Sequence, residues 1–274
     1  MKEKLHITLL QTSLHWEHPT ANLDLFDEMI FSCSETDIIL LPEMFTTGFT
    51  MNALALSEKN DGMVVEWMKI MSHKKKSAIC GSIIVEENGK YFNRLFWVQP
   101  DGKVFSYDKR HLFRMAEEDK TYSPGTKRLI VEYKGWRICP LVCYDLRFPA
   151  WSRNRKLKTD ENHCSVSSPD STVYDLLLYV ANWPAARNKP WKTLLEARAI
   201  ENQCFVAGVN RIGEDARPVD HSGDSRVVDF KGEIIAEANP GETTVVTASL
   251  SYRQLAEFRE KFPAWRDADE FQII

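Results

Sequence analysis

Residues 77–109 are SAICGSIIVEENGKYFNRLFWVQPDGKVFSYDK, a stretch in which two turn signals separate three β-type runs. The signals are Asn88-Gly89 and Asp101-Gly102, dipeptides that favour the tight turns of β-hairpins. The runs alternate between apolar and polar residues, as strands with one buried face do. The stretch therefore predicts three consecutive strands joined by hairpins.

Apolar runs of a different kind lie on either side of this stretch. DIILLPE (37–43) and DLLLYVANW (175–183) are nearly continuous apolar runs, which is typical of strands covered on both faces. Amphipathic stretches at 20–33, 62–76 and 189–203 predict helices among these strands. Further strands are expected at 5–12, 128–145, 204–211, 225–238 and 243–250, and a helix at 251–262. Buried strands mixed with helices and hairpins indicate two sheets packed face to face with helices outside, a layered α/β sandwich.

Length and composition limit the classes of protein that this chain can belong to. It has 274 residues, 43% hydrophobic and 27% charged, without a low-complexity linker, which favours one domain over 1–274. The net charge of −4 and the lack of a long basic run argue against nucleic acid or anionic lipid as a partner. No segment approaches the roughly 20 apolar residues of a membrane span, and no export signal is evident. We therefore expect a cytoplasmic protein.

Cysteine usage favours reduced thiols over disulfides or a metal site. The six cysteines are at positions 33, 80, 139, 143, 164 and 204. Cys139 and Cys143 are four residues apart with Pro140 between them, a spacing that fits neither a zinc site nor a C-x-x-C redox motif. Most of these thiols are expected in the core, and Cys164 is expected to be exposed.

One polar segment interrupts the pattern. From 154 to 172 the chain is NRKLKTDENHCSVSSPDST, rich in Ser, Asp and Lys and without periodicity. It separates the Cys143 region from the next buried strand, and we interpret it as a surface insertion.

Three ionisable residues lie at the ends of predicted strands, where α/β proteins place their sites. Glu43 follows the apolar run of 37–42, Lys109 ends the third hairpin strand, and Cys143 follows the strand ICPLV. A buried carboxylate suits a general base, and a lysine can donate to an oxyanion or lower the pKa of a nearby thiol. Taken singly, each has a simpler interpretation: a surface Glu, a solvated Lys and a core cysteine.

The residues after Cys143 suggest a sharp turn. In CYDLRFP the chain turns away from the strand, and a nucleophile on such a turn is followed by a backbone N–H that points into the same space. Tyr144 would supply that N–H as half of an oxyanion hole. His111 offers a Cys–His dyad instead, but the sequence around papain-like cysteines is missing, as are G-x-S-x-G, H-E-x-x-H and phosphate-loop motifs.

In this order, the segments resemble the nitrilase (carbon–nitrogen hydrolase) superfamily, whose Glu–Lys–Cys triad matches Glu43 in LLPEMFTTGF, Lys109 in YDKRHLF and Cys143 in LVCYDLRFP. The resemblance covers nearly the whole chain. It implies a four-layer αββα sandwich, a homodimer with the tail 251–274 at its interface, and no metal or organic cofactor. Glu118 matches the additional glutamate of the family. The segment 154–172 departs from the family, being longer than the usual connection.

KRHLFRMA, YVANWPAAR and REKFPAWRDADEF are most similar to the ω-amidase branch. This resemblance implies hydrolysis of the terminal amide of 2-oxoglutaramate or 2-oxosuccinamate through a thioester. Such a substrate carries a distal carboxylate, for which Arg147 and Arg187 are the candidates, although Arg147 could equally brace the nucleophile turn through an ion pair. Trp183 and Phe49 are candidate pocket walls or core residues. An N-carbamoyl amino acid amidase or a nitrilase would use the same triad, and a non-catalytic scaffold that binds small acids is the alternative outside catalysis.

Overall fold

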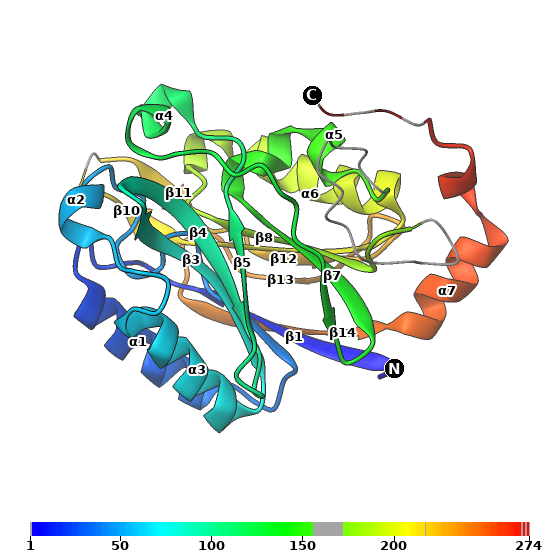
Figure 1. Ribbon diagram of the computed structural model, residues 1–274. Coiled ribbons are helices and arrows are strands. Elements are labelled where there is room, and N and C mark those ends of the chain that lie inside the picture. Colours follow the sequence, from blue (N-terminus) through cyan, green and yellow to red (C-terminus); the bar gives the residue numbers. More distant parts are fainter. Residues whose placement is uncertain (1, 156–171, 217, 270, 272, 274) are drawn as a thin grey trace.

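The computed structural model describes residues 2–155, 172–216, 218–269, 271 and 273. Two six-stranded sheets pack face to face, and Figure 1 shows α1 and α3 on one side of the pair and α6 on the other. This arrangement confirms the predicted four-layer α/β sandwich. Across the described ranges, none of the helices combines the length and apolarity that a bilayer crossing demands.

The first sheet has the order β14-β1-β2-β3-β4-β5. Its strands are β1 (Lys4–Gln11), β2 (Ile38–Leu40), β3 (Ala78–Glu87), β4 (Lys90–Val98), β5 (Val104–Asp108) and β14 (Thr244–Ser251). Strands β1, β2 and β3 are parallel, whereas β3, β4 and β5 form the two predicted hairpins. Asn88, at φ +53°, and Gly89, at φ +75°, have the left-handed conformations that a tight hairpin turn requires.

The second sheet has the order β13-β12-β9-β8-β7-β6. Its strands are β6 (Val131–Tyr133), β7 (Trp136–Val142), β8 (Leu176–Ala181), β9 (Phe205–Asn210), β12 (Arg226–Val228) and β13 (Ile234–Glu237). The central strands β7, β8 and β9 are parallel. Every residue of β8 is buried, because the first sheet covers one of its faces and α6 covers the other.

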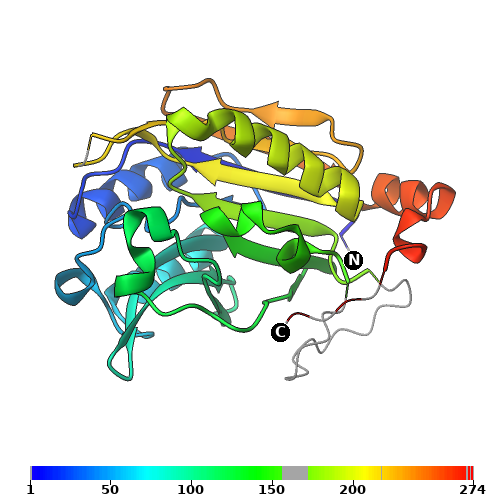
Figure 2. The same cartoon turned by 90° about the horizontal axis from the view of Figure 1, so that it is seen from above.

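The helices cover the outer faces of the sheets. Helices α1 (Pro19–Ser32) and α3 (Met63–Lys75) bury Phe26 and Met68 against the first sheet. Helix α6 (Asn188–Asn202) buries Trp191 and Leu195 against the second, and Figure 2 shows it lying along the strands. Helix α7 (Tyr252–Lys261) follows β14. Shorter helical elements are α2 (Ala53–Leu56), η1 (Arg114–Ala116), α4 (Glu118–Thr121), η2 (Cys143–Arg147), α5 (Pro149–Ser152), η3 (Ala185–Arg187) and η4 (Ala264–Arg266).

The predicted insertion 154–172 lies outside the described residues except at its ends, and so does Cys164. Both ends are buried, not exposed. The Asn154 side chain accepts hydrogen bonds from the backbone N–H groups of Val173 and Tyr174, and the Thr172 carbonyl accepts one from Arg137. The two ends of the segment are thus fixed to the second sheet.

A small hairpin escapes the sequence analysis. Strands β10 (Ile212–Glu214) and β11 (Asp220–Ser222) form a separate two-stranded sheet. Each has three residues, fewer than the four to eight over which an alternating pattern can be recognised.

Candidate active site

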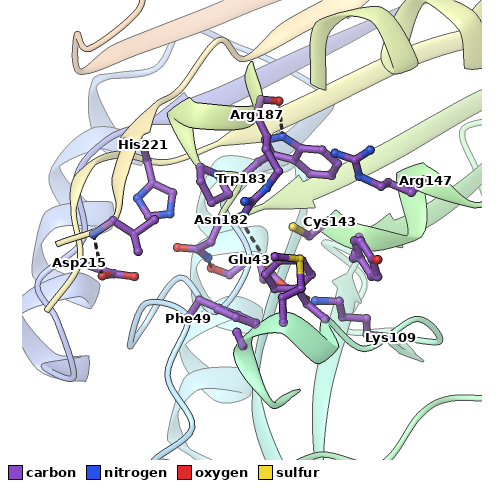
Figure 3. Close-up of a pocket in the computed structure, with 16 residues that line it drawn as sticks. Glu43, Phe49, Lys109, Cys143, Arg147, Asn182, Trp183, Arg187, Asp215 and His221 are labelled. Carbon is purple, nitrogen blue, oxygen red and sulfur yellow. Dashed lines mark hydrogen bonds and ion pairs between the residues drawn. The ribbon is translucent and has the colours of Figure 1, made fainter. Parts of the chain in front are cut away.

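The carboxyl ends of the central strands bring the candidate residues together (Figure 3). Glu43 lies three residues after β2, Cys143 directly follows β7, and Asn182 directly follows β8. Lys109 directly follows β5 of the first sheet. The two sheets therefore contribute to one site, because their strand ends meet at the same edge of the sandwich.

These side chains border a pocket of about 260 Å³. It is lined by Glu43, Phe49, Lys109, Phe113, Met115, Ala116, Cys143, Tyr144, Arg147, Asn182, Trp183, Pro184, Arg187, Asp215, Val219 and His221. Eight of the nine predicted site residues line it directly, and the ninth, Glu118, lies behind Lys109. Within the described ranges, no three His, Cys, Asp or Glu side chains are grouped as ligands for a metal ion.

Cys143 occupies a strained turn, as the sequence predicts. It begins the 3-10 turn η2 with φ +44°, a region that residues other than glycine rarely adopt. The buried carboxylate of Asp145 fixes this turn by accepting from the Val142 N–H at 3.1 Å. The same carboxylate accepts from the Tyr107 hydroxyl at 2.8 Å and from the His111 N–H at 3.0 Å. The turn that begins at Cys143 is thereby tied to the segment that carries Lys109.

His111 takes no part in a Cys–His dyad. Its ring Nδ1 lies 2.7 Å from Asp145 Oδ1, and the ring stacks on Phe148 with 3.8 Å between centroids. Because it is not among the residues that line the pocket, its contacts assign it to bracing the turn.

Lys109 lies between two buried carboxylates. Its Nζ is 2.8 Å from Glu43 Oε1 and 2.9 Å from Glu118 Oε2, and all three side chains are at most 1% exposed. Glu118, matched above to the additional glutamate of the family, belongs to this buried cluster. Its place at the start of α4, with Oε2 accepting from the Phe113 N–H, turns it inward.

Two asparagines hold these carboxylates, and the sequence analysis identified neither. Asn93 in β4 donates its Nδ2 to Glu43 Oε1 at 2.8 Å and to Glu118 Oε1 at 3.2 Å. The Asn182 backbone N–H donates to Glu43 Oε2 at 2.9 Å, and its Nδ2 donates to the Glu43 carbonyl. Asn182 ends the run YVAN, and a polar residue at the end of a buried parallel strand was a usable signal.

The pKa of the Cys143 thiol is shifted in the direction opposite to the one expected from a neighbouring lysine. Burial raises the pKa of the Cys143 thiol well above its usual range, and the neighbouring Glu43 carboxylate, which hydrogen-bonds it, raises it further. Lys109 opposes this rise without cancelling it. The prediction of a lowered thiol pKa is thus wrong, because desolvation and Glu43 outweigh the single ammonium.

The pKa values of Lys109 and Glu118 are shifted as well. Burial alone would lower the pKa of Lys109, but the charges of Glu118 and Glu43 reverse the effect and raise it, so the lysine stays an ammonium. Burial and the Glu43 charge raise the pKa of Glu118 despite the attraction of Lys109. The cluster thus has two carboxyl groups and one cation.

The aromatic and arginine side chains form the wider part of the pocket. Arg147 lies over the Trp183 ring at 5.2 Å, Arg187 over the Phe113 ring at 5.2 Å, and Lys109 Nζ over the Phe49 ring at 5.1 Å. In the part of the chain that the structure describes, no carboxylate pairs with Arg147 or Arg187. The suggested ion pair of Arg147 at the nucleophile turn is therefore not seen there. Trp183 also donates its Nε1 to the Arg187 carbonyl at 2.7 Å.

The unpredicted hairpin completes the wall opposite the arginines. Asp215, Val219 and His221 come from β11 and the connection before it, and Figure 3 places His221 and Asp215 on the far side of the pocket from Arg147. His221 Nδ1 lies 3.0 Å from the Gly213 carbonyl. Burial, together with the positive charge of Arg211, lowers the pKa of His221 to about 4.

Comparisons with known proteins agree with this geometry. The carbon-nitrogen hydrolase family profile matches residues 6–260. The omega-amidase YafV of Escherichia coli strain K12 is 50% identical, covering 98% of each chain, and the 2-oxoglutaramate amidase of Bacillus subtilis strain 168 is 31% identical, covering 96% of this chain and 97% of its own. The crystal structure of XC1258 from Xanthomonas campestris, described as a CN-hydrolase superfamily protein with an arsenic adduct in its active site, superposes with a TM-score of 0.93 at 44% identity and covers both chains fully. On this evidence the chain belongs to the carbon-nitrogen hydrolase family, which is the nitrilase superfamily.

Proposed function

We propose that this amide-hydrolysing enzyme releases ammonia from the terminal amide of a short 2-oxo dicarboxylic acid monoamide, 2-oxoglutaramate or 2-oxosuccinamate. The observation that carries the proposal is the pair Arg147 and Arg187 in the same pocket as Cys143. Each guanidinium rests on an aromatic ring and has no carboxylate partner among the described residues. Two such cations in a small pocket favour an anionic substrate, since a guanidinium binds a carboxylate through paired hydrogen bonds.

The relatives support the same substrate class. The Escherichia coli relative is named an omega-amidase, and the Bacillus subtilis relative a 2-oxoglutaramate amidase. Both align with this chain over nearly its whole length.

In the first half of the proposed reaction, Cys143 attacks the amide carbon as Glu43 takes its proton. Concerted removal of the proton suits a thiol whose pKa is raised, because little free thiolate precedes the attack. The oxyanion that forms accepts from the Lys109 ammonium and from the Tyr144 N–H. Tyr144 is the second residue of η2, where N–H groups have no carbonyl partner within the turn. One such donor typically lowers the barrier by about 3 kcal/mol.

In the second half, the carbon–nitrogen bond breaks and the thioester is hydrolysed. Glu43 passes its proton to the departing nitrogen, ammonia leaves, and the acyl group remains on Cys143. Water then attacks the thioester as Glu43 accepts a proton from it, and the acid and the free thiol are released after that proton returns to sulfur. Glu118 keeps Lys109 and Glu43 in place through the contacts with Lys109 and Asn93.

A panel of substrates tests the proposal. Ammonia release should be fastest with 2-oxoglutaramate or 2-oxosuccinamate, and slower with N-carbamoyl amino acids, simple nitriles and uncharged amides. Preferred turnover of a carbamoyl amino acid or a nitrile would replace the proposed substrate while leaving the triad in use.

Arginine variants test how the substrate is recognised. Arg187→Ala and Arg147→Ala should raise KM for 2-oxoglutaramate by about 10-fold or more, because each removes charge-assisted hydrogen bonds to a carboxylate. An uncharged amide should be affected far less. Arg114→Ala is the matched control, since Arg114 is exposed on η1 beside the pocket and does not line it. Equal losses for charged and uncharged amides would contradict the recognition role.

The nucleophile is tested separately. Cys143→Ala should abolish ammonia release with an unchanged fold, and a thiol-directed reagent should modify Cys143 in the wild type as seen by mass spectrometry. Near-normal turnover in the variant would remove Cys143 from the mechanism. A wild-type Cys143 that forms no adduct and gives no turnover would favour the non-catalytic scaffold.

A further inference from the structure

We propose that the side-chain oxygen of Asn182 binds the amide nitrogen of the substrate and makes the site selective for amides over esters. The inference rests on the amide hydrolysis by Cys143 and Glu43 proposed above and assigns a substrate contact to a residue outside the Glu–Lys–Cys set. Its starting point is a polar atom without a partner. Asn182 Oδ1 is buried and accepts no hydrogen bond, although Asn182 lines the pocket.

The orientation of this amide is fixed by its other end. Asn182 Nδ2 donates to the backbone carbonyl of Glu43, and exchanging the two ends of the amide would set two oxygens against each other. The backbone N–H of Asn182 is fixed as well, at 2.9 Å from Glu43 Oε2. Oδ1 is therefore the acceptor of Asn182's amide side chain that is left for a ligand.

Burial makes such an unpaired acceptor costly. Asn182 is 5% exposed, so its Oδ1 has little access to solvent. An unsatisfied buried acceptor destabilises a fold by roughly 1–3 kcal/mol, and a ligand that donates to it recovers part of that free energy. An unpaired acceptor beside a catalytic carboxylate is thus suited to a substrate that carries N–H groups.

The leaving nitrogen must lie beside Asn182 if Glu43 protonates it. Glu43 Oε1 is occupied by Lys109 Nζ at 2.8 Å and by Asn93 Nδ2 at 2.8 Å, whereas Oε2 faces the Asn182 backbone. Oxyanion and leaving group are then separated, with the oxyanion toward Lys109 and Tyr144 and the nitrogen toward Oε2 and Asn182. Figure 3 places Asn182 next to Glu43 on the side that leads to His221.

The chemistry of the leaving group gives the selectivity. A primary amide has two N–H groups, so it can donate one to Asn182 Oδ1 and keep the nitrogen lone pair directed at the proton on Glu43. As the carbon–nitrogen bond breaks, the electron pair stays on nitrogen, which takes that proton and leaves as ammonia. An ester oxygen has no hydrogen to donate and would face Oδ1 with a lone pair, and a site built to accept a hydrogen bond discriminates against a ligand that lacks it.

The experiment compares two substrates that form the same thioester, 2-oxoglutaramate and the 5-methyl ester of 2-oxoglutarate. In Asn182→Ala, the ratio of kcat/KM for the amide to that for the ester should fall about 10-fold relative to the wild type. Asn182→Ser should also lower the ratio, since the shorter side chain withdraws the acceptor from the position of Oδ1. If the alanine variant does not fold, the serine variant gives the result.

Asn93→Ala is the matched control. Asn93 is a buried asparagine that also donates to Glu43, but it does not line the pocket. Its loss should lower both activities by a similar factor and leave the amide-to-ester ratio unchanged.

The outcomes separate this inference from the proposed substrate. Unchanged amide-to-ester ratios in both Asn182 variants would overturn the role of Asn182. A wild type that does not hydrolyse 2-oxoglutaramate would overturn the proposed substrate instead. The same ratio is then measured with the amide and methyl ester of an acid whose amide the wild type does cleave.

Discussion

The backbone of Cys143 is held in a conformation that is unfavourable for a residue with a side chain. At φ +44° its Cβ crowds the following carbonyl, which costs roughly 1–2 kcal/mol for an L-residue. Asp145 holds the turn in place through the hydrogen bonds to the Val142 and His111 N–H groups. This geometry presents Cys143 at the pocket, which Tyr144 also lines.

Replacing Cys143 should therefore reveal the strain. We predict that Cys143→Gly is more stable than Cys143→Ala by about 1 kcal/mol, although glycine loses more entropy on folding and fills less space. Urea unfolding of the two inactive variants measures the difference. A glycine variant that is less stable than the alanine variant would show that the turn carries no such strain.

His221 should make the fold sensitive to acid. Burial and Arg211 hold its pKa at about 4, below its unfolded value of about 6.5. The neutral ring thus contributes stability that is complete above pH 6.5 and is lost as the pH falls through 4, by roughly 3 kcal/mol in total. His221→Gln should flatten the dependence of unfolding free energy on pH between 6.5 and 4. Parallel pH profiles for wild type and variant would contradict the prediction.

For single residues, the sequence reveals candidate site residues through their position at the end of a predicted strand. Glu43, Lys109 and Cys143 each follow a strand, and these ends converge in the structure. Glu118 was assigned from the family resemblance, and Asn93 was not recognised. Glu118 contacts Lys109 and Asn93 contacts Glu43, and no local motif indicates these contacts because each joins separate elements. Whether the pKa of Cys143 rises or falls also depends on burial, which no local motif indicates.

Among the elements, the loop after β5 determines where Lys109 points. Gly125 packs against this loop so closely that a Cβ there would lie 2.1 Å from the Asp108 carbonyl oxygen. Its N–H also donates to the Lys109 carbonyl at 2.9 Å. Gly125 ends the sequence Ser123-Pro124-Gly125, and only glycine permits this approach.

Gly125→Ala should displace Lys109. We expect a loss of stability of about 1–3 kcal/mol from overpacking, together with a fall in kcat because the ammonium leaves the oxyanion position. The control is Thr126→Ala, a change at the exposed neighbouring residue, which should alter neither. Thermal unfolding and ammonia release measure both quantities, and a fully active, stable Gly125→Ala would contradict the role of the close contact.

Helices and strands were predicted correctly where the hydrophobic pattern extends over many residues or where a turn motif separates two strands. The hairpins of β3, β4 and β5 and the helices α1, α3 and α6 lie within a residue or two of their predicted bounds. The hairpin β10–β11 was missed, and with it the wall of the pocket that carries Asp215 and His221. Short strands that pair only with each other carry too few residues to show a period.

For the whole molecule, we predict a homodimer with the tail 251–274 at its interface, as the family resemblance implies. Phe262 and Phe271 in this tail are 60% and 37% exposed, so the single chain leaves apolar surface uncovered there. Light scattering should give twice the chain mass of 31.6 kDa. Phe262→Ser combined with Phe271→Ser should shift the equilibrium toward the monomer on dilution. A wild type that is monomeric at every concentration would refute the dimer.

The shared ammonium of Lys109 also affects what happens after the chemistry. Hydrolysis turns a neutral carboxamide into a carboxylate beside Glu43, which already competes with Glu118 for one cation. The newly formed anion is repelled from the place where it was made, even though Arg147 and Arg187 still attract its distal carboxylate. We therefore expect the product acid to bind more weakly than the amide that gives rise to it, which steady-state inhibition by 2-oxoglutarate measures directly. The excess of negative charge at the bottom of the pocket would then speed product release and keep the acid from occupying the enzyme that makes it.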